Sequence, residues 1–206
     1  YRASKAVDLS QLPLPRTDLY LDKEGESYCP DDYPVQLSRG CPLACSACAL
    51  PLSMGRKLRE FPLAHALGQL EQLALRGKLA SLTEDTSFFA TPRRTLESLL
   101  SALVDRPTRA AISYVGISMP MILATPESTL DLLRTAGVRM FYLVGGFDPI
   151  TQQAFTGSHP GELVKAYAAI AKAHDAGIEP YTSFLFGNDT DNEGSFDRVL
   201  AFADRA

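Results

Sequence analysis

The stretch Tyr33-Pro-Val-Gln-Leu-Ser-Arg-Gly-Cys41-Pro-Leu-Ala-Cys45-Ser-Ala-Cys48 contains the two features on which the fold prediction depends. Residues 33–37 form a short apolar run that predicts a strand. Directly after this run, Cys41, Cys45 and Cys48 follow one another with the spacing C-x3-C-x2-C. Thiolates that cluster on one loop favour zinc or an iron–sulfur cluster. We therefore expect a metal site directly after the first strand.

The number of cysteines favours an iron–sulfur cluster over structural zinc. Structural zinc usually takes four ligands from two separated pairs, and this chain has no second pair. Cys29, the fourth cysteine, is expected to have a packing role, since free cysteine is among the most buried residue types. A cluster held by three thiolates keeps one position open, as a catalytic metal site requires. A non-catalytic module that holds zinc or a cluster for stability is the alternative.

From residue 60 onward, helical and extended patterns alternate. Strict alternation predicts parallel strands with right-handed crossovers, and hence an α/β fold. Both an open doubly wound sheet and a barrel or partial barrel fit this periodicity, and both place function at the C-terminal ends of the strands. Together with residues 33–37, the expected strands are 79–83, 110–117, 138–144 and 178–186, and the expected helices are 62–76, 91–103, 125–136, 161–176 and 193–206.

Residues 1–32, here called the lead-in, are rich in proline and lack a clear period. We expect them to form an irregular linker that packs on a catalytic core formed by residues 33–206. The 206 residues are 46% hydrophobic and 21% charged, with a formal net charge of −4, as in ordinary globular proteins. This charge argues against a general nucleic-acid binder, and the longest apolar runs are too short to span a bilayer.

The cysteine spacing after the first strand of a βα series resembles the signature of radical S-adenosylmethionine (SAM) enzymes. The resemblance implies a partial (β/α)6 barrel, like part of a TIM barrel, with about five βα units in this chain. It further implies that Cys41, Cys45 and Cys48 hold a 4Fe–4S cluster whose open iron binds SAM. One electron from such a cluster cleaves the sulfonium bond, which gives methionine and a 5′-deoxyadenosyl radical that abstracts hydrogen from a substrate.

Other stretches resemble the branch of this superfamily that carries an N-terminal cobalamin-binding domain. They are residues 13–19, 35–41, 82–86, 141–148 and 183–191. This resemblance implies a cytoplasmic enzyme that methylates carbon, or makes a related radical modification, on a small-molecule metabolite. It implies a reducing electron donor, cobalamin bound through a domain outside this chain, and neither nucleic acid nor a membrane as a partner. A methylthiotransferase or an oxidoreductase without cobalamin is the alternative within the superfamily.

The resemblance also implies which residues contact SAM. One of the carboxylates of Glu84 and Asp85 is expected to accept a hydrogen bond from the SAM ammonium group. Gly145 and Gly146 are expected to let backbone approach the ligand closely, and Asp148 to contact a ribose hydroxyl.

Two further positions, Ala47 and Phe186, complete the expected SAM contacts. The family usually has an aromatic residue before the third cysteine, so Ala47 retains only the backbone contact to adenine. Asp148 likewise departs from the family, which has glutamate at this position, because the aspartate side chain is shorter than that of glutamate. Since the resembled core has six βα units, we expect this chain to be the middle portion of a larger enzyme.

Overall fold

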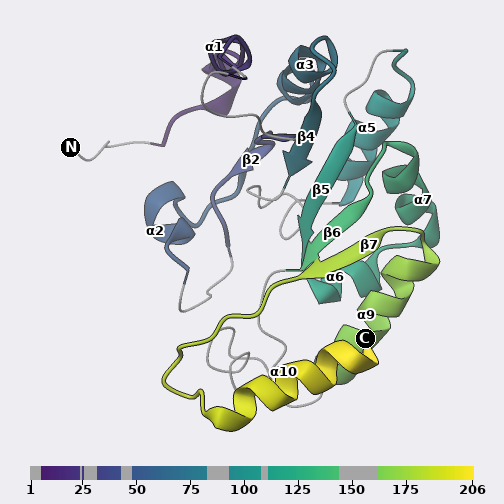
Figure 1. The fold of residues 1–206 in the computed structure, drawn as a ribbon. Helices are drawn as coiled ribbons and strands as arrows, with labels where there is room; N and C mark the ends of the chain where they lie inside the picture. Colours follow the sequence, from purple (N-terminus) through teal and green to yellow (C-terminus); the bar gives the residue numbers. More distant parts are fainter. Residues whose placement is uncertain are drawn as a thin grey trace.

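A five-stranded parallel sheet forms the centre of the computed structural model, which describes residues 6–23, 25, 32–42, 48–82, 93–107, 111–143 and 162–206 (Figure 1). The strand order is β1-β4-β5-β6-β7. Each neighbouring pair is parallel, so the predicted α/β fold is confirmed. The strands are β1 (Asp32–Pro34), β4 (Leu79–Leu82), β5 (Ile112–Ile117), β6 (Met140–Leu143) and β7 (Glu179–Thr182).

Helices connect these strands, and Figure 1 shows α5, α7 and α9 along one side of the sheet. In α3, Leu67, Leu70 and Leu73 are buried at the helical spacing that predicted the element. The chain leaves α3 through Gly77, whose φ of 65° favours glycine. The helices described after residue 60 are α3 (Leu63–Ala74), α5 (Arg93–Val104), α6 (Met119–Ala124), α7 (Glu127–Thr135), α9 (Glu162–Asp175) and α10 (Glu193–Arg205).

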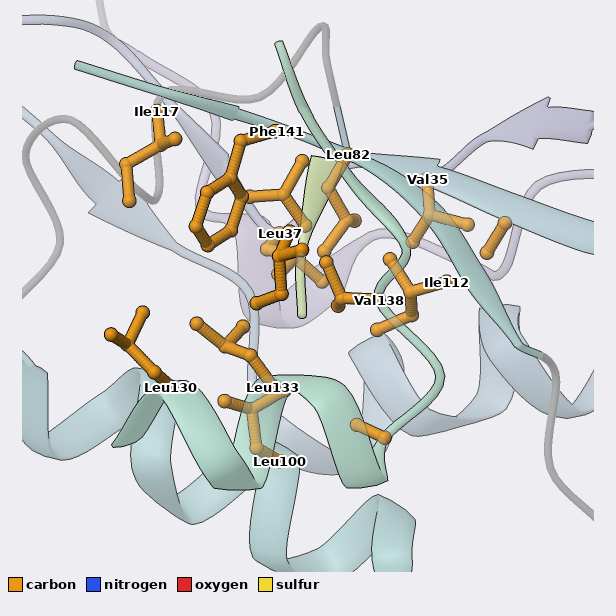
Figure 2. Close-up of a cluster of buried hydrophobic side chains, with 14 of the residues drawn as sticks. Val35, Leu37, Leu82, Leu100, Ile112, Ile117, Leu130, Leu133, Val138 and Phe141 are labelled. Atoms are coloured by element: carbon orange, nitrogen blue, oxygen red, sulfur yellow. The ribbon is translucent and has the colours of Figure 1, made fainter. Parts of the chain in front are cut away.

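The hydrophobic core lies between the sheet and these helices. Figure 2 shows Phe141 and Ile117 on the strand side and Leu100, Leu130 and Leu133 on the helix side. Phe141 and these three leucines are fully buried. Since burial of one such side chain contributes about 1.5–3 kcal/mol, this layer fixes the sheet against its helices.

The lead-in contains two short helices, η1 (Leu9–Gln11) and α1 (Asp18–Leu21), and it packs along α3. The Leu14 side chain lies against Gly68 of α3, where an added Cβ would meet it at 3.1 Å. The Thr17 hydroxyl donates a hydrogen bond of 2.6 Å to the Gln72 side chain. The division of the chain at residue 32 stays a prediction.

Several short elements were not predicted from the sequence. They are α2 (Leu50–Met54), α6, and the antiparallel pair formed by β2 (Ser38–Arg39) and β3 (Arg59–Glu60). The expected first strand is also shorter, although the Val35 N–H still donates 2.8 Å to the Ser81 carbonyl. Among the described residues, no helix is both long and apolar enough to cross a bilayer.

Candidate metal centre

The parallel strands all end at the same edge of the sheet, and the predicted site residues follow these ends in sequence. Cys41 and Cys48 come after β1, and Phe186 comes after β7. The other predicted site residues lie outside the residues that the structure describes: Cys45, Ala47, Glu84, Asp85, Gly145, Gly146 and Asp148. Their roles stay predictions.

Two of the three motif cysteines are described, and both are free thiols. Cys41 is buried, with 7% of its surface exposed, whereas Cys48 is exposed. Of the described residues, no three His, Cys, Asp or Glu side chains converge on one point. Because soft metal groups prefer thiolate ligands, Cys41 and Cys48 remain candidate ligands.

Backbone hydrogen bonds close the chain on both sides of the cysteine motif, at a feature that we call the cysteine neck (residues 36–41 and 55–61). The Phe61 N–H donates 2.9 Å to the Leu37 carbonyl, and the Cys41 N–H donates 3.1 Å to the Gly55 carbonyl. Between them, β2 pairs with β3. The neck therefore fixes where the motif begins and where the chain returns from it.

Gly40 shows that this neck tolerates no side chain directly before Cys41. Its φ is 95°, and an added Cβ would overlap the Lys57 carbonyl. We expect Gly40→Ala to lower the free energy of unfolding by more than the roughly 1–3 kcal/mol of a left-handed non-glycine residue, because the overlap adds to that strain.

Gly187→Ala is the matched control for Gly40→Ala. Gly187 has a φ of 94°, but no atom lies within 4 Å of an added Cβ. Urea unfolding of the two variants therefore separates the overlap from the backbone strain. Equal losses in both variants would contradict the close contact at the neck.

The strand register separates two faces of the sheet. Side chains at paired positions of parallel strands project to the same face. Val115 pairs with Phe141, and both are buried beneath the helices. Tyr142 and its partner Tyr181 lie on the other face, where Tyr181 is 52% exposed. Their rings stack with centroids 5.7 Å apart. This second face is therefore the one available to a ligand.

Two contacts near the end of β7 were not predicted. The Tyr142 hydroxyl lies 3.1 Å from the Ser183 hydroxyl. The Phe186 ring, a predicted SAM contact, stacks on Phe196 with centroids 4.5 Å apart and stays 39% exposed. No local sequence signal reveals the Tyr142–Ser183 contact, because it joins separate strand ends.

The loop after Phe186 is held by one carboxylate. Asp191 accepts hydrogen bonds from the Gly187 N–H at 2.7 Å and from the Asn188 N–H at 2.9 Å. The next residue, Asn192, forms a capping box with Ser195 that begins α10. Asn and Asp in a run after a strand are the signal that predicts such a turn.

Comparison with known proteins gives one family match, which covers most of the chain. The family model described as Radical SAM superfamily matches residues 35–203.

Two curated relatives align with most of this chain. The "Uncharacterized methyltransferase sll1242" of Synechocystis is 27% identical over 99% of this chain and 37% of its own length. The ribosomal protein uS12 methylthiotransferase RimO of Helicobacter pylori is 24% identical over 82% of this chain and 39% of its own length. This chain therefore spans less than half the length of each relative.

Solved structures share the fold at low sequence identity. The cobalamin-dependent SAM radical enzyme OxsB, with aqua-cobalamin and SAM bound, gives a TM-score of 0.76 at 14% identity, over 98% of this chain and 30% of its own. The radical SAM methyltransferase TsrM of Kitasatospora setae, with cobalamin and a [4Fe-4S] cluster bound, gives 0.65 at 20% identity, over 84% of this chain and 35% of its own. A second TsrM structure holds its tryptophan substrate and a SAM analogue.

Proposed function

Because the chain belongs to the radical SAM superfamily, we propose that it is the core of an enzyme that cleaves SAM reductively to methylate carbon in a small molecule with the help of cobalamin. The observation that carries the proposal is the motif Cys41-x3-Cys45-x2-Cys48, which follows β1 of a parallel sheet after the two-residue strand β2. A soft, three-thiol donor set of this kind suits an iron–sulfur cluster with one open position.

In this proposal the three motif cysteines hold a 4Fe–4S cluster. When bound, the cluster supplies the electron that splits SAM into methionine and a 5′-deoxyadenosyl radical. The cysteine neck presents the buried thiol of Cys41 from a fixed backbone position, because the N–H of this residue is bonded to Gly55. The exposed thiol of Cys48 then completes the ligand set with Cys45.

The SAM contacts are proposed from the positions that match the family pattern. Glu84 or Asp85 orients the ammonium group, Asp148 holds a ribose hydroxyl, and Gly145 and Gly146 admit the ligand close to the backbone. The exposed part of the Phe186 ring, which Phe196 holds by stacking, offers adenine a flat apolar surface. The backbone of Ala47 adds a further adenine contact.

The names of similar proteins support methyl transfer and the use of cobalamin. The relative sll1242 is named a methyltransferase, TsrM is a methyltransferase with cobalamin, and OxsB is cobalamin-dependent. The tryptophan bound to TsrM supports a small-molecule substrate. We place cobalamin in a domain outside this chain and the enzyme in the cytoplasm, with a reducing electron donor.

A methylthiotransferase is the second candidate, and the similarity to RimO favours it. That relative is named for action on a ribosomal protein, so this candidate also changes the substrate class. The two candidates differ in the group that the product gains, which is a methyl group in one and a methylthio group in the other.

The test uses the full-length protein, reconstituted anaerobically with iron and sulfide. We expect iron and labile sulfide in the ratio of a 4Fe–4S cluster, and methionine and 5′-deoxyadenosine after reduction with SAM. Product mass then separates methyl from methylthio transfer, and omission of cobalamin should stop only the first. One bound zinc without labile iron would instead identify a structural module and overturn the proposal.

A further inference from the structure

We propose that the lead-in is a brace for the cysteine neck, and that Arg59 and His65 carry this brace by binding backbone carbonyls of the lead-in. The inference deepens the proposed function, since the neck presents the motif that would hold the cluster. It concerns positioning residues, because neither Arg59 nor His65 belongs to the motif. Four sets of contacts support it.

The first set ties α3 to the beginning of the neck. Gln69 is buried, with 6% of its surface exposed. Its side-chain Nε2 donates 2.9 Å to the Gln36 carbonyl, and its Oε1 accepts from the Gln36 N–H at 3.4 Å. The amide of Gln69 therefore pairs with Gln36 as a neighbouring strand would, five residues before Cys41.

The second set extends this link to the lead-in. Gln69 Nε2 also lies 3.1 Å from His65 Nδ1, and His65 Nε2 lies 3.1 Å from the Pro13 carbonyl. Because the amide can only donate from Nε2 and a carbonyl can only accept, the network assigns the acceptor role to Nδ1 and the proton to Nε2. Pro13 is thereby connected through two side chains to Gln36.

The third set holds His65 against the opposite strand of the neck. Its ring stacks on Phe61, with centroids 4.5 Å apart and planes inclined by 17°. The Arg39 guanidinium lies 5.7 Å from the centroid of the Phe61 ring and donates 2.9 Å to the Gln36 side chain. A displacement of His65 would therefore disturb the contacts of both strands of the neck.

The fourth set lies on the other side of the motif. Arg59 of β3 donates from Nη1 to the Val7 carbonyl at 2.9 Å and from Nη2 to the Met54 carbonyl at 3.0 Å. Met54 is the last residue of α2, which follows Cys48. One guanidinium thus joins the lead-in to the segment that leaves the motif, while His65 joins it to the segment that enters.

The experiment compares variants that break the brace with variants that spare it, in the full-length protein. Arg59→Met removes both carbonyl contacts of Arg59. His65→Asn keeps an acceptor near Gln69 but loses the reach to Pro13, whereas His65→Gln keeps a donor for Pro13. Arg76→Met is the matched control, because Arg76, in the turn after α3, also binds the lead-in, through Asp22 at 2.9 Å, away from the neck.

Two readouts are measured, one of them without any cluster. In the apoprotein we expect His65→Asn to speed alkylation of the buried Cys41 thiol about fivefold, as the loss of a single hydrogen bond would. Arg59→Met loses two hydrogen bonds and should speed this alkylation more than His65→Asn does. In the reconstituted protein we expect both variants to speed cluster loss to a chelator about tenfold, as is usual when residues that position the metal ligands are changed. We also expect a changed electron paramagnetic resonance signal of the reduced cluster.

Arg76→Met should match the wild type in both readouts. His65→Gln loses the stacking on Phe61 but keeps a donor for Pro13, so it should change both readouts less than His65→Asn does. Circular dichroism confirms that each variant is folded. The brace is wrong if Arg59→Met and His65→Asn behave as the wild type, or if Arg76→Met changes both readouts as much as they do. A wild type that takes up no iron would overturn the proposed function instead. The rate of Cys41 alkylation in the apoprotein would then be the one test of the proposed brace.

Discussion

Cys41→Ser is expected to remove cluster binding and to reduce SAM cleavage to the background of the assay. Serine keeps the size of the side chain, but its hydroxyl is a poor ligand for iron, so the soft donor set loses a member. The measurements are iron and labile sulfide per chain and the amount of 5′-deoxyadenosine formed under reduction. Cys45→Ser and Cys48→Ser should give the same loss.

Cys29→Ser is the matched control for these variants, because Cys29 lies outside the motif and is expected only to pack. It should retain the cluster and the cleavage. Cys41 is buried, so a hydroxyl at this position also costs about 1–3 kcal/mol of folding stability, and a thermal melt must accompany the metal analysis. Cys48 is exposed and avoids this complication. Full cluster content in the folded Cys48→Ser protein would contradict the ligand assignment.

Phe141→Ala is expected to lower the free energy of unfolding by about 3–5 kcal/mol, the usual loss for an aromatic residue removed from a core. Phe141 is fully buried between β5 and β7 and faces the leucines of α5 and α7, as Figure 2 shows. Removal of its ring leaves a cavity, because the packed sheet and the two helices cannot move far enough to close it. Urea denaturation measures the change.

The same substitution at Phe196 provides the comparison. Phe196 is 57% exposed on α10, so its loss should cost less than about 1 kcal/mol, as expected for a surface position. A similar loss of stability in both variants would contradict the placement of Phe141 at the centre of the core.

Much of the sheet and its helices could be predicted from local patterns. The leucines of α3 recur at helical spacing, and Gly77 follows the helix. The two ends of α3 were therefore predicted to within a few residues. The strand β6 was likewise identified, because a short run of aliphatic and aromatic residues bounded by turn signals is typical of a strand. These signals lie within a few consecutive residues, which is why sequence alone reveals them.

The elements that were missed have weak local signals. Helix α6 spans Met119–Ala124, and six mainly apolar residues after a strand look like the end of that strand. Strands β2 and β3 have two residues each, too few to show alternation. The Arg59 side chain donates to the Val7 carbonyl, 52 positions away in sequence. Contacts of this range depend on the tertiary fold and leave no local pattern.

The candidate site likewise has a part that could be predicted from local sequence and a part that could not. The cysteine spacing is local and chemically specific, so the motif was identified from sequence. The neck that holds it depends on Gly40 fitting beside Lys57 and on Gln69 reaching Gln36 from a separate helix. The order of the strands brings these segments together, and this order is known only from the strand pairing in the structure.

Among the described residues, strand β7 lies at one end of the strand order, and its sequence limits how a further strand can pair with it. The Glu179 N–H points toward β6, where it donates 2.9 Å to the Arg139 carbonyl. Since successive N–H groups of a strand alternate in direction, the nitrogen of the next residue points away from β6. That residue is Pro180, which has no proton to donate. Any strand that pairs with this side of β7 is therefore left without one donor at the centre of β7, which disfavours edge-to-edge pairing with an unrelated chain.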